Sequence, residues 1–275
     1  MDFSVTRVQE KLYLLTKRIG LPAYDFEFSN HFYCDHPGIW DGEIQAISRL
    51  GATNDYEARF NALLSFDIRL IHSPEEYKRT SFLPEWYPLI QELTPRSRWY
   101  DQFPEAADIE DHFEFPVFVK GERQTNRHSR AKSIMRNASE LRQLAEIWDR
   151  DPILHWQRVV IRDYIPLQLI ATDHGHTMPK AYEFRTFWWK GHCVSTGNYW
   201  TSEAYALSDD DQAEMLRVAG EAATLLNVAF LVIDMAKTQA GKWIVIEIND
   251  GQDAGYAGNN PFFLWNNILQ LESED

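Results

Sequence analysis

Two carboxylates and an amide near the C-terminus have the types and the spacing of a magnesium site. Asp234 ends an apolar run, and Glu247 and Asn249 end another apolar run shortly after it. On a strand, Glu247 and Asn249 project from the same face, and Asp234 joins them if the two runs pair as a hairpin. Such hard oxygen ligands suit an Mg²⁺ ion that also contacts phosphates. The alternative is that both acids are solvated strand ends and that the residues after Asn249 form an ordinary turn.

A basic stretch follows a short apolar strand in the middle of the chain. Residues 115–120 read Phe-Pro-Val-Phe-Val-Lys, so Lys120 ends a predicted buried strand. Between residues 120 and 136 the only acid is Glu122, and the basic residues are Lys120, Arg123, Arg127, Arg130, Lys132 and Arg136. A lysine at a strand end can direct its charge at a phosphate, and the loop after it can fold over a nucleotide. The alternative is a solvated basic loop or a patch that contacts RNA.

Two further strands carry charged residues close together. Glu183 and Arg185 alternate along a predicted strand and share a face, where the arginine can stabilise the charge that develops during phosphoryl transfer. A structural salt bridge between them is the alternative. Residues 162–165 end another strand before Pro166, where backbone donors and acceptors can meet the edge of a base. Taken alone, that segment is an ordinary strand end.

The elements that must position these residues mix helices with hairpins. We expect strands over 115–120, 158–166, 182–189, 192–198, 229–234 and 243–248, and helices over 139–148 and 208–227. Lys190-Gly191 marks the turn of one hairpin, and Ser208 is the expected N-cap of the longer helix. Near the N-terminus the apolar spacing predicts a helix over residues 5–19 that stops at Gly20, and Ser73-Pro74 predicts another helix start. This mixture predicts an α+β fold, or mixed α/β, rather than a doubly wound sheet.

Composition limits the class of protein. The 275 residues are 44% apolar, enough for a sizeable core, and no apolar run reaches the ~18 residues of a membrane span. A formal charge of −14 opposes general binding to nucleic acid or to anionic membranes, although the basic stretch leaves nucleic acid open as a substrate. Two cysteines imply no disulfide framework, and the first residues lack the pattern of a signal peptide. We therefore expect a cytoplasmic protein.

In their order along the chain these segments resemble the ATP-grasp superfamily. The resemblance covers about residues 113–258 and is strongest to bacterial and phage members that use one arginine and two lysines. It rests on this order: strand with Lys120, basic loop, helix, hinge strand, Glu183-x-Arg185 hairpin, helix, strand with Asp234, then Glu247-x-Asn249. It implies an ATP-grasp fold with a small preceding domain over 1–112, a lid subdomain over about 113–165 and a metal-binding subdomain over about 166–275.

The resemblance also implies roles for single residues. Lys120 and Lys132 would bind the phosphates of ATP, and Lys132 would act in catalysis with Arg185, which meets the γ-phosphate or the developing acyl phosphate. The remaining nucleotide-binding residues would be the adenine hinge and one strand acid: Arg162, Asp163, Tyr164, Ile165 and Glu183. The Mg²⁺ ligands would be Asp234, Glu247 and Asn249.

The activity implied is that of an ATP-dependent carboxylate–amine ligase. Mg-ATP would phosphorylate a small-molecule or peptide carboxylate, and an amine would then displace phosphate from the acyl phosphate. Two alternatives stay open: a phosphotransferase acting on a small molecule or nucleic acid, and a non-catalytic ATP-binding regulatory protein. The aromatic residues 187–189 and 199–200 are most simply core and rim packing, with the lining of a substrate pocket as the alternative.

Overall fold

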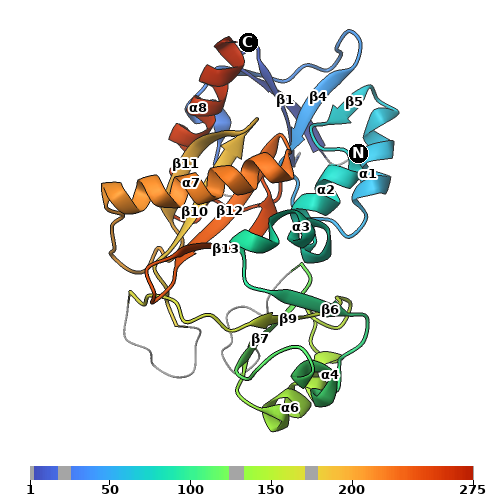
Figure 1. The fold of residues 1–275 in the computed structure, drawn as a ribbon. Helices are drawn as coiled ribbons and strands as arrows, with labels where there is room; N and C mark the ends of the chain where they lie inside the picture. The colour runs from blue at the N-terminus through green and yellow to red at the C-terminus, as the bar shows by residue number, and fades with distance from the viewer. Residues whose placement is uncertain (1–2, 18–25, 124–132, 171–178, 275) are drawn as a thin grey trace.

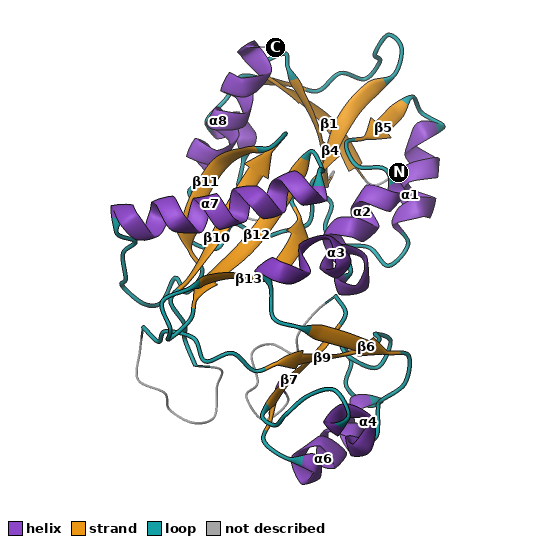
Figure 2. Ribbon diagram, in the orientation of Figure 1, coloured by secondary structure: helices purple, strands orange, loops and turns teal. Residues whose placement is uncertain are grey.

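Three β-sheets with helices packed on them form the framework of the protein (Figure 1). A computed structural model describes residues 3–17, 26–123, 133–170 and 179–274. In Figure 2 the sheet with β6, β7 and β9 lies in a separate lobe beside the larger body, together with α4 and α6. The mixture of hairpins, parallel strands and helices confirms the α+β class expected from the sequence.

The first sheet has the strand order β3-β1-β2-β4-β5. Its strands are β1 (Phe3–Val8), β2 (Leu12–Lys17), β3 (Cys34–Asp35), β4 (Ile44–Ser48) and β5 (Ile68–Leu70). β1 pairs antiparallel with β2 and β3, whereas β2, β4 and β5 run parallel. Side chains of α1 (Tyr56–Leu64) and α2 (Pro74–Ser81) pack on this sheet in one apolar cluster. A short 3-10 helix, η1 (Phe28–Asn30), precedes β3.

The helix predicted over residues 5–19 is wrong, because the described part of this segment, up to residue 17, belongs to the β1–β2 hairpin. Gln9 and Glu10 both adopt left-handed backbone angles, with φ of 50° and 59°, and make the tight turn. Leu14 and Leu15 are both fully buried, but they face different cores on the two sides of the sheet. A strand buried on both faces reads as a continuous apolar run, so the spacing of its residues does not distinguish it from a helix.

Helix α2 begins where the sequence predicted. The Oγ of Ser73 accepts the N–H of Glu76, and the Glu76 carboxylate accepts the N–H of Ser73, which completes a capping box ahead of Pro74 at the first helical position. α3 (Leu83–Ile90) and the 3-10 helix η2 (Gln91–Leu93) follow and lead into the second sheet.

The second sheet, called the lid sheet below, has the order β6-β9-β7-β8. It consists of β6 (Ser97–Tyr100), β7 (Val117–Gly121), β8 (Ile134–Met135) and β9 (Val159–Asp163), with helices α4 (Ala106–Glu110) and α6 (Ala138–Trp148). Leu141, Leu144 and Trp148 of α6 are buried against β7 and β9 in one cluster. The predicted strands around 115–120 and 158–166 and the helix over 139–148 are confirmed.

The expected domain division between residues 112 and 113 stays a prediction. β6 lies before that boundary, but it pairs antiparallel with β9, which lies after it. Since hydrogen-bonded strands of one sheet belong to one packing unit, this pairing favours a boundary before Ser97.

The third sheet carries the predicted metal residues and has the order β11-β10-β12-β13. It consists of β10 (Glu183–Trp189), β11 (His192–Asn198), β12 (Phe230–Lys237) and β13 (Trp243–Asp250), all antiparallel. α7 (Asp209–Leu226) covers one face, while α8 (Pro261–Glu274) and the first sheet share a core with the other. Ser208 caps α7 by accepting the N–H of Asp211, as predicted. The predicted Lys190-Gly191 turn is also confirmed, with φ of 45° and 84°.

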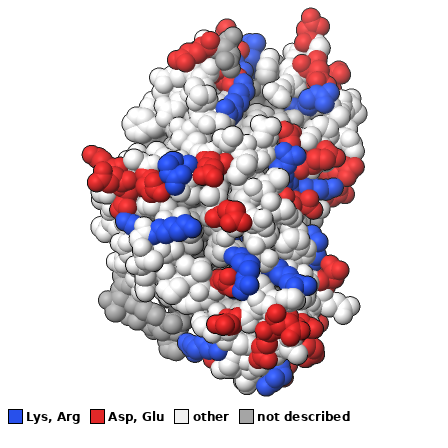
Figure 3. All heavy atoms as spheres, in the orientation of Figure 1, with Lys and Arg blue, Asp and Glu red and all other residues white. Residues whose placement is uncertain are grey.

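The face of the molecule shown in Figure 3 carries charges of both signs, with basic side chains lying among acidic ones. None of the described helices is long and apolar enough to cross a membrane.

Candidate functional site

Strand register brings three of the predicted site residues into one row. Arg185 on β10 lies opposite Asp234 on β12, which lies opposite Glu247 on β13. Asn249 lies two residues further along β13, opposite Val232. Directly opposed residues of antiparallel strands project from the same face of a sheet, so the four polar side chains share one face. The hairpin that the sequence predicted therefore does bring both acids and the amide together.

Arg185 and Asp234 form a fork-like ion pair. Nε and Nη2 of Arg185 donate to Oδ1 and Oδ2 of Asp234 at 2.8 and 2.7 Å, and the Asp234 side chain is 1% exposed. Two parallel charge-assisted bonds fix the guanidinium plane as well as its distance. Nη1 of Arg185 also donates to the carbonyl of Gly255 at 2.8 Å, in the loop after β13. The salt bridge that we considered for Glu183 and Arg185 is thus made by Arg185 with Asp234.

Lys120 connects the lid sheet to the third sheet. Its ammonium, at the end of β7, donates to Oε1 of Glu247 on β13, and the two side chains are 4% and 22% exposed. Burial would raise the pKa of Glu247, but the nearby Lys120 outweighs burial and the pKa is lowered. Glu247 is therefore ionised at neutral pH and holds the lysine at the junction of the two sheets.

A cavity of about 210 Å³ lies at the same junction. Apolar side chains from both sheets line it, among them Phe118 and Ile134 of the lid sheet and Ile246 of β13. The lining also includes the ionisable residues Lys120, Glu183 and Glu247 and the predicted hinge, residues 162–165. An apolar cavity with a few convergent polar groups is the usual form of a small-molecule site.

The side chains of Arg162 and Asp163 hold the hinge in place. Arg162 is buried and donates to the Ile246 carbonyl at 2.8 Å, to Oγ1 of Thr94 at 2.6 Å and to Oγ of Ser97 at 3.0 Å. Burial lowers the pKa of its guanidinium to about 10, against the attraction of Glu247. Asp163 makes a two-bond pair with Arg96, at 2.9 and 3.1 Å. These contacts favour structural roles for the two side chains, and nucleotide binding by the hinge stays a prediction.

Glu183 also lies in the cavity lining. Trp200 Nε1 donates to its Oε2 at 3.1 Å. Burial, together with the nearby charges of Asp234 and Glu247, raises the pKa of Glu183 well above its usual value. The Glu183 carboxyl group therefore holds its proton to a higher pH than an ordinary glutamate does.

Sequence reasoning assigned two aromatic residues of this cavity most simply to the core. Tyr199 and Trp200 line the cavity, and the Arg185 guanidinium lies 5.3 Å from the centroid of the Tyr199 ring. Phe187, Trp188 and Trp189 are core residues, as expected. The available signal was the position of Tyr199 and Trp200 just beyond the strand that pairs with Glu183-x-Arg185.

Among the described residues of the basic stretch, one contributes to this site. Lys132, Arg127 and Arg130 lie outside the described residues. Arg136 pairs with Glu140 at the start of α6, on the surface, and Arg123 contacts Thr53 and Tyr77 instead of the cavity. Of the described residues in this stretch, Lys120 is the one that reaches the predicted metal residues.

The oxygen groups on β12 and β13 fit a magnesium ion that binds together with a nucleotide. Within the described residues no group of three His, Cys, Asp or Glu side chains could hold a metal. The candidate set is two carboxylates and one amide, and Mg²⁺ characteristically takes one or two carboxylates and completes its shell with water and phosphate. Lys120 contacts one oxygen of Glu247, whereas Arg185 engages both oxygens of Asp234. Glu247 and Asn249 are therefore the better placed ligands.

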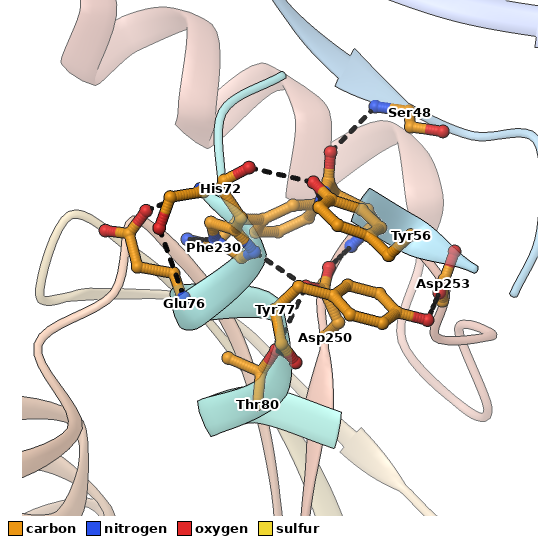
Figure 4. Close-up of polar contacts among 12 residues, drawn as sticks. Ser48, Tyr56, His72, Glu76, Tyr77, Thr80, Phe230, Asp250 and Asp253 are labelled. Carbon is orange, nitrogen blue, oxygen red and sulfur yellow. Dashed lines mark hydrogen bonds and ion pairs between the residues drawn. The ribbon is translucent and has the colours of Figure 1, made fainter. Parts of the chain in front are cut away.

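A buried polar network holds the end of β13 in place (Figure 4). Nδ1 of His72 lies 2.6 Å from Oδ2 of Asp250, and His72 Nε2 accepts the Phe230 N–H at 3.0 Å. Because Nε2 accepts, Nδ1 carries the proton and donates to Asp250. Thr80 Oγ1 donates to the same carboxylate at 3.0 Å. Asp250 follows Asn249 directly, so this network positions the candidate metal strand; nothing in the sequence alone paired residues 72 and 250.

A family model described as an ATP-grasp domain matches residues 101–268, more than half of the chain. The chain belongs to the ATP-grasp family. The match spans all of β7 to β13, and therefore the Lys120, Asp234 and Glu247 positions. The resemblance inferred from the order of the motifs is thereby confirmed at the level of the family.

Solved ATP-grasp structures share the fold at low sequence identity. VanG D-Ala:D-Ser ligase from Enterococcus faecalis has a TM-score of 0.58 and 13% identity over 83% of this chain and 72% of its own. D-alanine–D-alanine ligase from Bacillus anthracis, complexed with ATP, has a TM-score of 0.58 and 14% identity over 84% of this chain and 79% of its own. A RimK domain ATP-grasp protein from Sphaerobacter thermophilus has a TM-score of 0.53 and 15% identity over 76% of this chain and 73% of its own. A search of curated proteins found no match. At these identities the structural likeness shows the ATP-grasp fold, as predicted.

Proposed function

We propose that this protein is an ATP-dependent ligase that joins a carboxylate to an amine through an acyl phosphate. The observation that carries the proposal is that Lys120 of the lid sheet and Glu247 of the third sheet meet in the cavity lining, with the Arg185–Asp234 pair next to Glu247 in the same row of the sheet. This arrangement offers an apolar space for a base, a buried ammonium for phosphates and oxygen ligands for a metal.

The roles of individual residues follow from their positions. The adenine would occupy the apolar part of the cavity beside Tyr164 and Ile165, and Lys120 would move from Glu247 to a phosphate. Arg185 would stabilise the charge on the transferring phosphoryl group, held in orientation by Asp234. Lys132, outside the described residues, is the second phosphate lysine of this proposal.

Glu247 and Asn249, with a share from Asp234, would hold Mg²⁺ when ATP binds. The bound ion would neutralise negative charge on the phosphates. The approach of a metal and a polyphosphate gives Lys120 and Glu247 new partners of opposite charge, so their mutual contact can open without leaving either charge unpaired.

The proposed reaction has two steps. A carboxylate oxygen of the acid attacks the γ-phosphorus of ATP, which breaks the bond to ADP and forms an acyl phosphate. The nitrogen of the amine then attacks the acyl carbon, phosphate leaves, and the amine loses a proton. The enzyme would contribute the positioning of the reactants and the stabilisation of charge. The VanG and D-alanine–D-alanine ligases support this class of reaction because their names describe the joining of two amino acids.

Calorimetric titration with ATP, with and without Mg²⁺, tests the site. We expect magnesium-dependent binding by the wild type that Lys120→Ala and Glu247→Gln each weaken at least tenfold, because each loses a charged contact that counts for about 1.5–3 kcal/mol. Lys190→Ala is the matched control, since Lys190 also pairs with a glutamate, Glu272, at the hairpin turn outside the cavity lining. Unimpaired binding by both site variants would contradict the placement of the nucleotide.

Product analysis tests the reaction. Wild-type enzyme incubated with ATP and a panel of acids and amines should release ADP and phosphate only when both an acid and an amine are present. A stable phosphorylated product without an amide would indicate the phosphotransferase instead. Release of AMP and pyrophosphate would overturn the acyl-phosphate route.

A further inference from the structure

Three separate parts of the chain meet at the hydroxyl of Tyr77. Tyr77 belongs to α2, Arg123 follows β7 of the lid sheet, and Asp253 lies in the loop after β13. Nη2 of Arg123 donates to the Tyr77 hydroxyl, and this hydroxyl donates to Oδ2 of Asp253 at 2.9 Å. Figure 4 shows Tyr77 and Asp253 joined in this way. Arg123 Nη2 and Asp253 Oδ2 are 3.8 Å apart, so the two charges also attract each other directly.

The lid side of this cluster is fastened by further bonds. Arg123 Nη1 donates to the Thr53 carbonyl at 2.9 Å, and the carbonyl of Glu122 accepts the N–H of Leu83, at the start of α3, at 2.9 Å. The Arg123 guanidinium lies 5.5 Å from the centroid of the Tyr77 ring. The side chains of Arg123 and Asp253 are 7% and 12% exposed. In such a poorly solvated place these bonds and charges are stronger than on the surface.

The position of the cluster in the chain connects it to the site. Arg123 lies three residues after Lys120, and Asp253 lies four residues after Asn249. The cluster therefore joins the ends of the same two strands, β7 and β13, that carry Lys120 and Glu247. Tyr77 is the link between them, and its ring is held by stacking on Tyr56, with centroids 3.9 Å apart and planes 7° from parallel.

We propose that Tyr77, Arg123 and Asp253 are positioning residues: a hydrogen-bonded latch that holds the end of β7 against α2 and the loop after β13, and thereby sets where Lys120 stands for the nucleotide phosphates. The part concerning phosphates rests on the proposed function. The Tyr77 hydroxyl is the centre of the latch because it accepts from the lid side and donates to the loop. Arg123, which the sequence shows only as part of the basic stretch, acts through Lys120 in this arrangement.

Tyr77→Phe removes the central hydroxyl and leaves the stacked ring, and Tyr56→Phe is its matched control. Tyr56 lies in the same interface; its hydroxyl donates to the His72 carbonyl at 2.9 Å and accepts from Gln252 Nε2 at 3.1 Å, and neither of these partners belongs to the lid sheet. We expect Tyr77→Phe to raise the Kd for Mg-ATP about threefold to tenfold, as the loss of one net hydrogen bond allows. Tyr56→Phe should leave this Kd unchanged, although it should lower the melting temperature by about as much as Tyr77→Phe does.

Hydrogen exchange at the Leu83 amide measures how often the latch opens, and it needs no nucleotide. Leu83 donates to the lid carbonyl of Glu122, so opening of the latch exposes this N–H. We expect its exchange to be about threefold to tenfold faster in Tyr77→Phe and unchanged in Tyr56→Phe. Unchanged exchange in Tyr77→Phe would overturn the latch whether or not ATP binds.

The two measurements separate the latch from the proposed function. Faster exchange with an unchanged Kd would overturn the positioning of Lys120, because the lid would then be held without any effect on the phosphates. Failure of the wild type to bind Mg-ATP would overturn the proposed function, while the exchange rates would still decide whether the three residues hold the lid.

Discussion

Two glutamates of the candidate site have pKa values shifted in opposite directions because their surroundings differ. Lys120 lowers the pKa of Glu247, whereas burial raises the pKa of Glu183 well above its usual value, with Asp234 and Glu247 adding repulsion. The cavity lining therefore holds two glutamates whose pKa values are shifted in opposite directions. In the proposed function Glu247 serves the metal, and Glu183 can donate a hydrogen bond to the nucleotide when it is protonated.

Asp253 predicts a pH dependence of stability. Burial, with repulsion from Asp250, raises its pKa from 3.8 to about 6 despite Arg123 and Arg59. Between these two values the folded protein holds a proton that the unfolded chain releases, so the wild type loses stability as the pH rises through this window, by about 3 kcal/mol in total. Asp253→Asn should remove this part of the slope.

Urea denaturation of the wild type and Asp253→Asn at several pH values from 4 to 7 measures this effect. Stability of the variant relative to the wild type should increase up to about pH 6 and then level off. The test uses the slope and not the absolute stability, because the substitution also weakens the ion pair with Arg123. Parallel curves for the two proteins would show that Asp253 has an ordinary pKa.

The backbone segment before α8 lies in close contact with β11, next to the strand that carries Arg185. Gly197 on β11 lies opposite Arg185 on β10, and a Cβ added to Gly197 would lie 2.4 Å from the backbone of Gly258 and Asn259. Asn259 in turn donates through Nδ2 to the Arg185 carbonyl at 3.1 Å. The glycine allows the segment before α8 to lie directly against the sheet and to fix the strand that carries Arg185.

Gly197→Ala should destabilise the protein by about 1–3 kcal/mol, because backbone atoms must move to admit the methyl group. Gly38→Ala is the control, since a Cβ there meets nothing within 4 Å and the residue is exposed. Thermal unfolding measures both variants. A Gly197→Ala protein as stable as the control would show that the two segments separate easily.

At the scale of the whole molecule, the first and third sheets share one hydrophobic core. Val8, Leu14 and Ile47 of the first sheet pack in the same cluster as Phe187 and Val232 of the third. Arg49, at the end of β4, donates through Nη1 to the carbonyls of Gly251, Gln252 and Ala254. The His72–Asp250 pair crosses the same interface with both side chains fully buried. The N-terminal region is therefore part of the framework that holds the candidate site.

His72→Leu should lower the free energy of unfolding by about 3–5 kcal/mol, because it leaves the buried Asp250 carboxylate without its main partner. Thr80→Val, which removes one weaker bond to the same carboxylate, should cost about 1 kcal/mol. Arg69→Ala breaks an exposed pair with Glu43 and should change stability by less than about 1 kcal/mol. Urea unfolding followed by tryptophan fluorescence ranks the three. Equal losses for His72→Leu and Arg69→Ala would contradict the shared interface.

Elements whose contacts are local could be predicted from the sequence alone. The β12–β13 and β10–β11 hairpins have short connections, so alternation and turn residues were enough to expect Asp234 near Glu247 and Asn249 and to put Glu183 and Arg185 on one strand. Order along the chain then indicated the ATP-grasp fold. Helix starts at Ser73 and Ser208 were readable for the same reason, because capping involves residues only three apart.

Only the tertiary structure decided which charges meet. Lys120 and Glu247 are 127 residues apart, and their contact depends on how the lid sheet packs on the third sheet. The same holds for the latch at Tyr77, for the His72–Asp250 pair and for Arg162, whose partners lie on other strands. It also decided that residues 5–17 belong to a hairpin, since burial on both faces of a sheet removes the apolar period that distinguishes a strand from a helix. Local spacing determines which face a side chain takes, whereas the packing of sheets determines what that face touches.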